Sequence, residues 1–256
     1  MSFESQGLAI CIGLFVFLLL CLEVGFRSGL RASKLEDGQG AGQVGAIQGA
    51  ILGLLGLLLA FSFSAAASRF LERQDLIVQE ANAIGTAFLR ADLIEEPHRS
   101  ELRGLFKKYT DHLIEVSERL AFGLQSSDLQ QVEDLHHRMW QTAIAGVASR
   151  PVVSLAVLAP LNDVIDIHST RLAAGRKHLP MPVLGLLMAA SGLALGVIGY
   201  GSGLGKKRRM VMTLSLVAII GMALWITLDL DHPRVGLLQL SDAPLKALKL
   251  DVPRGE

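Results

Sequence analysis

The sequence GLAICIGLFVFLLLCLEVGF, residues 7–26, decides the class of this fold. Only Glu23 interrupts its apolar character, and about 20 apolar residues are the length that a helix needs to cross the hydrocarbon core of a bilayer. No lysine or arginine precedes the run, which is also longer than the apolar region of a signal peptide. We therefore expect a membrane-spanning helix that is retained in the mature protein.

Three further apolar runs follow, at residues 44–68, 183–200 and 210–228. Short connectors, at residues 27–42 and around 201–209, join the runs in pairs. The expected fold class is an all-α membrane protein with four transmembrane helices in two hairpins and a helical extramembrane domain between the second and third. The expected domains are residues 1–68 for the first hairpin, 69–178 for the helical domain, 179–228 for the second hairpin and 229–256 for a C-terminal tail.

The overall composition agrees with membrane insertion. Hydrophobic residues make up 51% of the chain, and the mean hydropathy is positive. The 24 basic and 24 acidic residues cancel, so no global charge favours binding to nucleic acid. Cys11 and Cys21 lie roughly 15 Å apart in one helix, too far to form a disulfide with each other.

The region between the two hairpins is amphipathic and is divided by Pro97, Pro151 and Pro160. We expect four helices there, at about 70–94, 98–122, 127–149 and 152–176. No proline or strong breaker separates Gly56 from Glu96, which predicts that the second span and the first of these helices form one helix projecting well beyond the membrane. We expect the tail to lie along the membrane surface or the helical domain.

Small residues recur every three or four positions in the second and third apolar runs. Such a stripe lets helices approach closely in lipid, where apolar burial alone gains little. Tight helix packing, within the subunit or between subunits, is the expected role, and lining of a narrow pore is the alternative. The candidate packing residues are Gly45, Gly49, Gly53, Gly56, Gly192, Gly196 and Gly199.

Basic residues predict the orientation. Arg27, Arg31 and Lys34 lie in the first connector, and Lys206 to Arg209 are all basic in the last. The positive-inside rule places short basic connectors in the cytoplasm. The N-terminus, the helical domain and the C-terminus are therefore expected on the other side of the membrane.

Motifs for cofactor or metal chemistry are missing from the sequence pattern. A phosphate-binding loop around residues 199–207 would need glycine in place of Tyr200 and serine or threonine in place of Lys207. Leu204 stands where a third glycine would complete a dinucleotide motif. Only His136 and His137 are adjacent among the histidines, and they point to different faces of a helix. We expect no cofactor, no metal site, no catalytic residues and no enzymatic activity.

Three polar clusters interrupt the apolar pattern. One combines Glu80, Asn82, Thr86, Arg90 and Asp92; a second combines Asn162, Asp163, Asp166, His168 and Arg171; a third, where the last span ends, combines Asp229, Asp231 and Arg234. The first two clusters either satisfy each other as a structural polar network or form an ion-binding vestibule. In the structural interpretation, Arg90 pairs with Asp163 or Asp166, because a guanidinium on an apolar face needs an acceptor.

Four segments together resemble the bacterial bestrophin-like family, also called the DUF4239 family. They are LLLAFSFSAAASRF at 57–70, EANAIGTAFLRAD at 80–92, LNDVIDIH at 161–168 and DLDHPRVG at 229–236. The resemblance covers most of the chain from about residue 45 onward. Bestrophins are pentameric ion channels with four transmembrane helices and a large helical region between the second and third, although they keep that region and both termini in the cytoplasm.

The resemblance implies a multi-pass protein of the bacterial inner membrane that forms a homo-oligomer, with a pentamer as the bestrophin assembly. Its implied partners are the lipid bilayer and inorganic ions, and no nucleic acid. The candidate pore or vestibule residues, along the second span and its extension, are Ser62, Arg69, Arg73, Glu80, Asn82 and Arg90. The alternative is a non-conducting membrane scaffold or sensor whose helical domain binds a partner.

Overall fold

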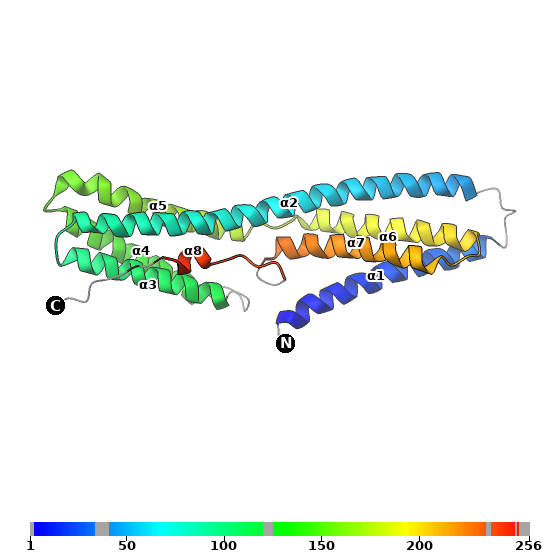
Figure 1. The fold of residues 1–256 in the computed structure, drawn as a ribbon, viewed down its shortest axis with the longest axis horizontal. Coiled ribbons are helices and arrows are strands. Elements are labelled where there is room, and N and C mark those ends of the chain that lie inside the picture. The colour runs from blue at the N-terminus through cyan, green and yellow to red at the C-terminus, as the bar shows by residue number, and fades with distance from the viewer. Residues whose placement is uncertain (1–2, 34–40, 120–124, 234–236, 249, 251–256) are drawn as a thin grey trace. The chain divides into compact units, whose positions relative to one another are not determined.

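A computed structural model describes residues 3–33, 41–119, 125–233, 237–248 and 250 (Figure 1). Within these residues all regular secondary structure is helical, which confirms the expected all-α class. The α-helices are α1 (Phe3–Ala32), α2 (Ala41–Arg90), α3 (His98–Arg119), α4 (Ser126–Val147), α5 (Ser154–Gly175), α6 (Met181–Leu204), α7 (Met210–Asp231) and α8 (Ala243–Lys246). Short 3₁₀ turns, η1 (Ala91–Leu93) and η3 (Pro151–Val153), follow α2 and precede α5.

The chain forms two compact units. One contains Met1–Phe70 and His178–Leu238, and we call it the apolar unit. The other contains Leu71–Lys177 and Gln239–Glu256, and we call it the bundle unit.

The apolar unit contains α1, the first part of α2, α6 and α7. Its core includes Leu18, Leu55 and Leu195, all almost fully buried. Helices α1 and α6 pack closely against each other, because glycines face each other across the contact. A Cβ atom built on Gly25 would lie 1.9 Å from the carbonyl oxygen of Gly196, so this close approach is restricted to residues without a side chain.

Five helices in the described residues are long and apolar enough to cross a membrane. Four of these segments overlap the expected spans: Ala9–Ala32, Val44–Leu93, Met181–Leu204 and Met210–Asp231, with mean hydropathies between 2.1 and 2.6. The fifth, Pro151–Gly175, has a lower mean hydropathy of 1.3.

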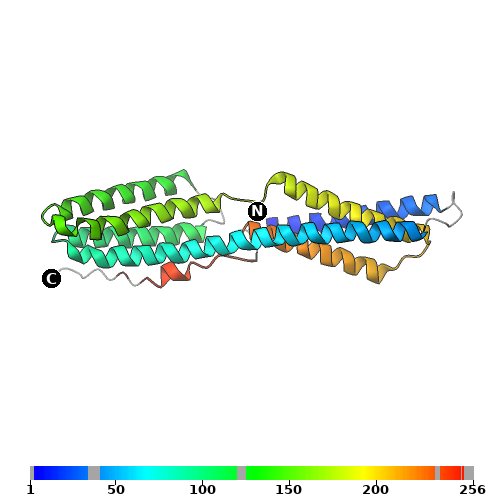
Figure 2. The same cartoon turned by 90° about the horizontal axis from the view of Figure 1, so that it is seen from above.

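The bundle unit packs α3, α4 and α5 with the second part of α2 (Figure 2). Fully buried Phe106, Tyr109, Met139 and Leu161 fill its core. The four helices expected here are present, and α2 is a single helix of 50 residues, as the absence of a breaker predicted. At 1.5 Å per residue it is about 75 Å long, more than twice the thickness of a hydrocarbon core.

The C-terminal segment packs on the bundle unit, one of its two expected positions. Leu245 of α8 is fully buried in the bundle core. The Lys246 ammonium lies 2.7 Å from the Glu118 carboxylate, and the Gln74 side chain both donates to and accepts from the backbone of Ser241.

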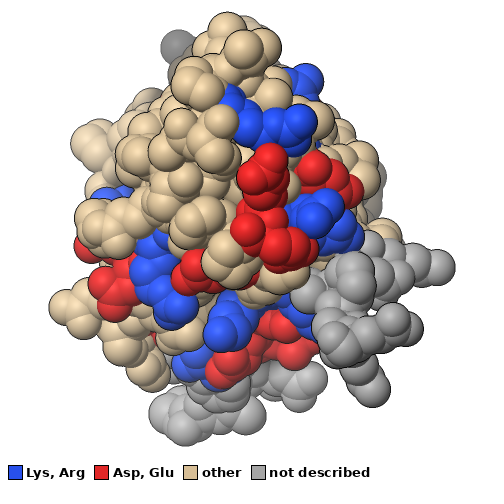
Figure 3. All heavy atoms as spheres, turned by 90° about the vertical axis from the view of Figure 1, so that its left-hand side faces the viewer, with Lys and Arg blue, Asp and Glu red and all other residues tan. Residues whose placement is uncertain are grey.

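Charges of both signs are interspersed over one end of the bundle unit (Figure 3). Arg99 pairs with Glu96, and Arg103 pairs with Asp92. Since neither sign dominates this surface, it is not a site that would attract ions of one sign.

Candidate functional site

Helix α2 divides the predicted pore residues between two faces. The side chains of Ser62, Arg73 and Glu80 are buried inside their own units. Asn82 and Arg90, by contrast, are exposed. The pore assignment of these residues stays a prediction, but the two groups cannot line one surface of α2.

Glu80 is the centre of a polar network in the bundle core. Its side chain is fully buried, and its Oε1 atom accepts a hydrogen bond of 2.9 Å from the Tyr109 hydroxyl of α3. On α5, His168 Nδ1 lies 3.0 Å from the same oxygen, and the Arg171 guanidinium pairs with Oε2. One carboxylate thereby joins α2, α3 and α5.

Two aromatic groups beside Glu80 have perturbed ionisation. The ring centroids of His136 and Tyr109 lie 5.0 Å apart, and those of His136 and His168 lie 5.4 Å apart. Burial, assisted by electrostatic interaction with His168, lowers the pKa of His136 to about 4. Burial and the Glu80 carboxylate raise the pKa of Tyr109 well above its usual value. Both rings therefore stay neutral at neutral pH, which suits a fixed network better than proton transfer.

Arg73 caps the end of α5. Its buried guanidinium donates a hydrogen bond of 3.1 Å to the carbonyl oxygen of Ala174 and another to that of Lys177. Carbonyl groups at a helix C-terminus have no partners within the helix, and a cation there is favoured by the helix dipole. Arg73 therefore has a local structural role.

The predicted pairing of Arg90 with Asp163 or Asp166 is wrong. Arg90 donates instead to the carbonyl oxygen of Ala156 at 3.1 Å, and Asp166 accepts a hydrogen bond of 2.7 Å from Asn162. The physical reason is that Arg90 is exposed, so water solvates its charge and no carboxylate is required. The sequence placed this position on an apolar face because it could not show which side of α2 is covered.

Asp231 anchors the end of α7 in the apolar unit. Its side chain is fully buried, and Arg69 Nη2 lies 3.1 Å from Oδ1. The backbone N–H of Leu179 donates to both carboxylate oxygens, at 3.1 and 2.9 Å. Asp229 similarly accepts from the N–H groups of Leu237 and Leu238. Arg234, which the sequence grouped with these aspartates, lies outside the described residues.

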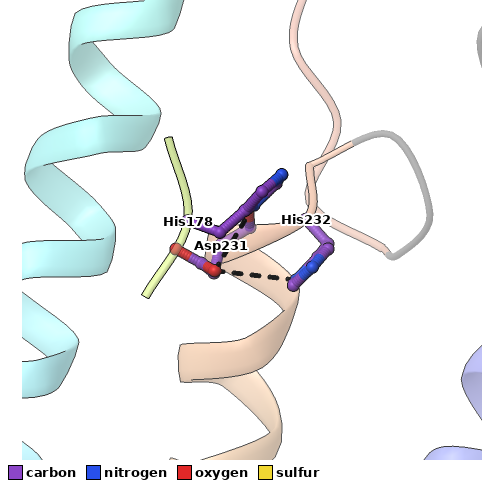
Figure 4. A group of neighbouring side chains, drawn as sticks. All are labelled: His178, Asp231 and His232. Carbon is purple, nitrogen blue, oxygen red and sulfur yellow. Dashed lines mark hydrogen bonds and ion pairs between the residues drawn. The ribbon is translucent and has the colours of Figure 1, made fainter. Parts of the chain in front are cut away.

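His178 and His232 lie beside the Asp231 carboxylate (Figure 4). Their ligand atoms and that of Asp231 are all within 4.8 Å of one another, a distance that a metal site could use. The two imidazole rings, however, are stacked with an interplanar angle of 8° and centroids 4.5 Å apart. A metal ion binds in the plane of each imidazole, and two nearly parallel planes do not meet at one ion.

The positive charge of Arg69 also balances Asp231, which lowers the attraction for a second cation. The geometry favours a hydrogen-bonded junction between the segment before α6 and the end of α7. Sequence inspection missed this group because the chain between His178 and Asp231 spans 53 positions, and no local motif signals it.

The remaining predicted polar residues lie along a groove between α2 and α5. Asn82, Thr86, Asp163 and Asp166 line it, and it encloses about 360 Å³. All four side chains are exposed. Ions or a partner therefore have direct access to the polar side chains of this groove.

The two glycine stripes differ in their surroundings. On α6, a Cβ atom at Gly192 would lie 3.1 Å from Cys21 Sγ, and one at Gly199 would lie 2.1 Å from the Leu22 carbonyl oxygen. Gly196 also faces α1, with the Cys21 carbonyl oxygen at 3.7 Å. On α2, Cβ atoms at four glycines would have no atom of the described part of the chain within 4 Å: Gly45, Gly49, Gly53 and Gly56. The α6 stripe therefore packs within the subunit, and the α2 stripe faces away from the described part of it.

The comparisons with known proteins return one family. A family model described as a bestrophin-like domain matches residues 9–245, which is nearly the whole chain. No curated protein and no solved structure matches the chain.

Proposed function

The chain belongs to the bestrophin-like family, and from this premise we propose that it is an ion channel rather than an enzyme. In this proposal several copies surround an axis along which inorganic ions cross the inner membrane of a bacterial cell. A homo-oligomer of five copies is the assembly that the family resemblance favours. The apolar helices fit a membrane protein of bestrophin-like type.

We propose four membrane spans in two hairpins: α1 with the first part of α2, and α6 with α7. In this arrangement α5 lies outside the bilayer, although it is long enough to cross it. Its His168 and Arg171 side chains bind the buried Glu80 of the bundle core. Charged side chains in the hydrocarbon core are costly, so a helix with this polar content is more stable beside α3 and α4 in water.

The observation that carries the proposal is the uncovered face of α2. Leu55, Ser62 and Ala66 turn toward the core of the apolar unit, whereas Cβ atoms built on the glycines from Gly45 to Gly56 would have no atom of the described residues within 4 Å. In lipid, a face of small residues gains most when another helix packs closely on it. We propose that this face of α2 turns toward the other copies and the shared axis.

The residues that would line the ion path are therefore those on the outer side of α2. The exposed residues there are small or carry a hydroxyl group: Gly53, Ala60, Ser64 and Ser68. An exposed carboxylate follows at Asp75. Further along, Asn82 and Thr86 line the open groove beside α5. One Asp75 from each copy would form a ring of carboxylates, which favours cations.

Planar-bilayer recording of the purified protein in a salt gradient tests this proposal. We expect a cation-selective current, and we expect Asp75→Asn to move the reversal potential toward zero because the carboxylate ring is lost. Asp111→Asn is the matched control, since Asp111 is an exposed aspartate of α3 outside the proposed path.

Two results would contradict the proposal. An intact oligomer that passes no current would favour a membrane scaffold or sensor whose bundle unit binds a partner. A current whose selectivity is the same in Asp75→Asn and in the unchanged protein would place the ion path elsewhere.

A further inference from the structure

A groove opens between α1, α6 and α7 in the apolar unit. It encloses about 380 Å³, and its walls are mainly aliphatic. Val16, Leu19 and Leu20 of α1 form one wall, and Leu214 of α7 forms part of the other. The walls belong to helices that we assign to the membrane, so lipid acyl chains have direct access to them.

Basic side chains close one end of this groove. Arg208 and Arg209 line it, and exposed Lys206 and Lys207 precede them in the chain. The Arg208 guanidinium lies 4.2 Å above the Phe26 ring and 3.1 Å from the Glu23 carboxylate. These two contacts hold the guanidinium at the mouth of the groove while 47% of the side chain remains exposed.

The charge at this end is positive overall. Glu23 is shared, since Arg27 also lies 2.8 Å from its Oε1 atom. One carboxylate therefore faces two arginines, with Arg209 and the two lysines in addition. A guanidinium has five N–H donors, so Arg208 keeps donors for a second anion after binding Glu23.

The groove thus combines an apolar channel in the membrane with a cationic mouth, and we propose that it binds one anionic phospholipid. The phosphate lies against Arg208 and Arg209, since guanidinium groups bind phosphate oxygens in a bidentate manner. One acyl chain lies along Val16, Leu19 and Leu20. Met210, where α7 begins, lines the same mouth, and the first N–H groups of a helix have no partners within the helix.

The headgroup decides which lipid this site selects, because lipids with identical acyl chains fill the groove equally well. An acyl chain gains little on leaving the bilayer for an apolar groove, because both surroundings are hydrocarbon. The anionic headgroup, by contrast, meets basic side chains at this site that the surrounding lipid does not offer. Each nearby arginine or lysine strengthens the binding of anionic lipid about fivefold, equivalent to about 1 kcal/mol. The site should therefore distinguish lipids by charge and much less by chain length.

Native mass spectrometry of the full-length protein in detergent tests the proposal. Phosphatidylglycerol and phosphatidylcholine with identical acyl chains are titrated separately, and we expect clear preference for phosphatidylglycerol. The double variant Arg208→Gln and Arg209→Gln should bind phosphatidylglycerol about 25-fold more weakly. The same pair changed to lysine should retain most of the preference, because the positive charge remains.

Two comparisons separate this site from general charge attraction. Lys107→Gln with Lys108→Gln removes the same charge from exposed positions on α3 and should leave lipid binding unchanged. Leu214→Trp fills the groove without altering charge and should weaken binding, because a lipid whose acyl chain is excluded cannot bring its phosphate to the arginines. Free glycerol phosphate at millimolar concentration should not compete, because without an acyl chain it is not concentrated beside the groove.

Specific results would overturn the proposal. Equal binding of the two lipids shows that no charge-selective site exists. An equal loss in the α3 and connector double variants shows only nonspecific attraction. Unchanged binding in Leu214→Trp, with strong competition by glycerol phosphate, shows a simple phosphate site rather than a lipid groove. Thermal unfolding of each variant establishes that it is folded, and Leu214→Trp tests the groove even if the arginine variant is unstable.

Discussion

Buried charges in this protein are bound by partners from several helices. Glu80 accepts hydrogen bonds from α3 and α5, Arg73 donates to carbonyl groups at the end of α5, and Asp231 binds Arg69 and a backbone N–H group. A buried charge without such partners costs several kcal/mol. These residues consequently specify which helices pack together, and they are poor candidates for ion contact.

His136 makes the stability of the bundle unit depend on pH. Its pKa falls from 6.5 to about 4 in the folded state, so protons bind preferentially to the unfolded state. The bundle unit has its full stability above pH 6.5 and loses stability as the pH falls toward 4. The loss in free energy of unfolding is about 2.5 kcal/mol at pH 4.5. We expect amide hydrogen exchange in α3 and α4, corrected for intrinsic rates, to show this loss of protection.

His136→Phe should remove most of this pH dependence, because phenylalanine has no proton to bind and can pack against the Tyr109 ring. His137→Phe is the matched control, since the neighbouring His137 is exposed. Equal pH dependence in the two variants would show that other groups cause the effect.

The helices use glycine in two different ways. On α1 and α6, Gly25, Gly199 and Gly203 permit backbones to touch within the subunit. On α2, the stripe has no neighbour in the described residues of the subunit. The same pattern of small residues therefore has two outcomes. On α6 it forms a contact within the subunit, and on α2 it leaves a face uncovered by the described residues.

Substitution of these glycines should separate the two roles. Gly199→Ala places a methyl group 2.1 Å from a backbone oxygen of α1, and it should lower the free energy of unfolding by about 1 to 3 kcal/mol. Gly53→Ala, where the added methyl meets nothing, should leave it unchanged or raise it slightly. Thermal unfolding in detergent measures both.

The larger change Gly53→Leu should dissociate the oligomer without affecting the subunit, as seen by light scattering during size-exclusion chromatography. An oligomer that survives Gly53→Leu would mean that this face contacts lipid. A loss of subunit stability in Gly53→Ala equal to that in Gly199→Ala would contradict the distinction between the stripes.

The membrane topology concerns the whole molecule and follows from charge and helix length. The short connectors carry Arg27, Arg31 and Lys34 in one case and four consecutive basic residues in the other. Basic connectors stay in the cytoplasm. With the four proposed spans, this rule predicts that the bundle unit and both termini lie on the opposite side, the reverse of the bestrophin arrangement that the resemblance implies.

Reporters fused before Met1 and after Glu256 should both be non-cytoplasmic. The measurement is paired activity of alkaline phosphatase and green fluorescent protein fusions, which are active on opposite sides of a bacterial inner membrane. Two cytoplasmic termini would show that the family arrangement prevails over the connector charges. Termini on opposite sides would show that α5 is a fifth span and that the two-hairpin topology is wrong.

The sequence by itself determined the helical class, the apolar segments and the continuity of α2. The length of an apolar run, its composition and the positions of prolines can be read directly from the sequence. Comparison of the run length with the thickness of the bilayer then shows which runs are long enough to cross it. The long α2 could be predicted for the same reason, since nothing between Gly56 and Glu96 breaks a helix. For the C-terminal tail, which contains α8, the sequence left two possible positions, the membrane surface and the helical domain. A segment this short has no periodicity that would indicate its partner.

Only the tertiary structure decided how each helix is rotated and what it touches. That rotation buries Ser62, Arg73 and Glu80 and exposes Asn82 and Arg90, although all five belong to one helix. It also joins His178 to Asp231 and the α6 glycines to α1. These contacts depend on packing between segments that are distant in sequence, and residue spacing within one helix carries no information about the partner that covers each face.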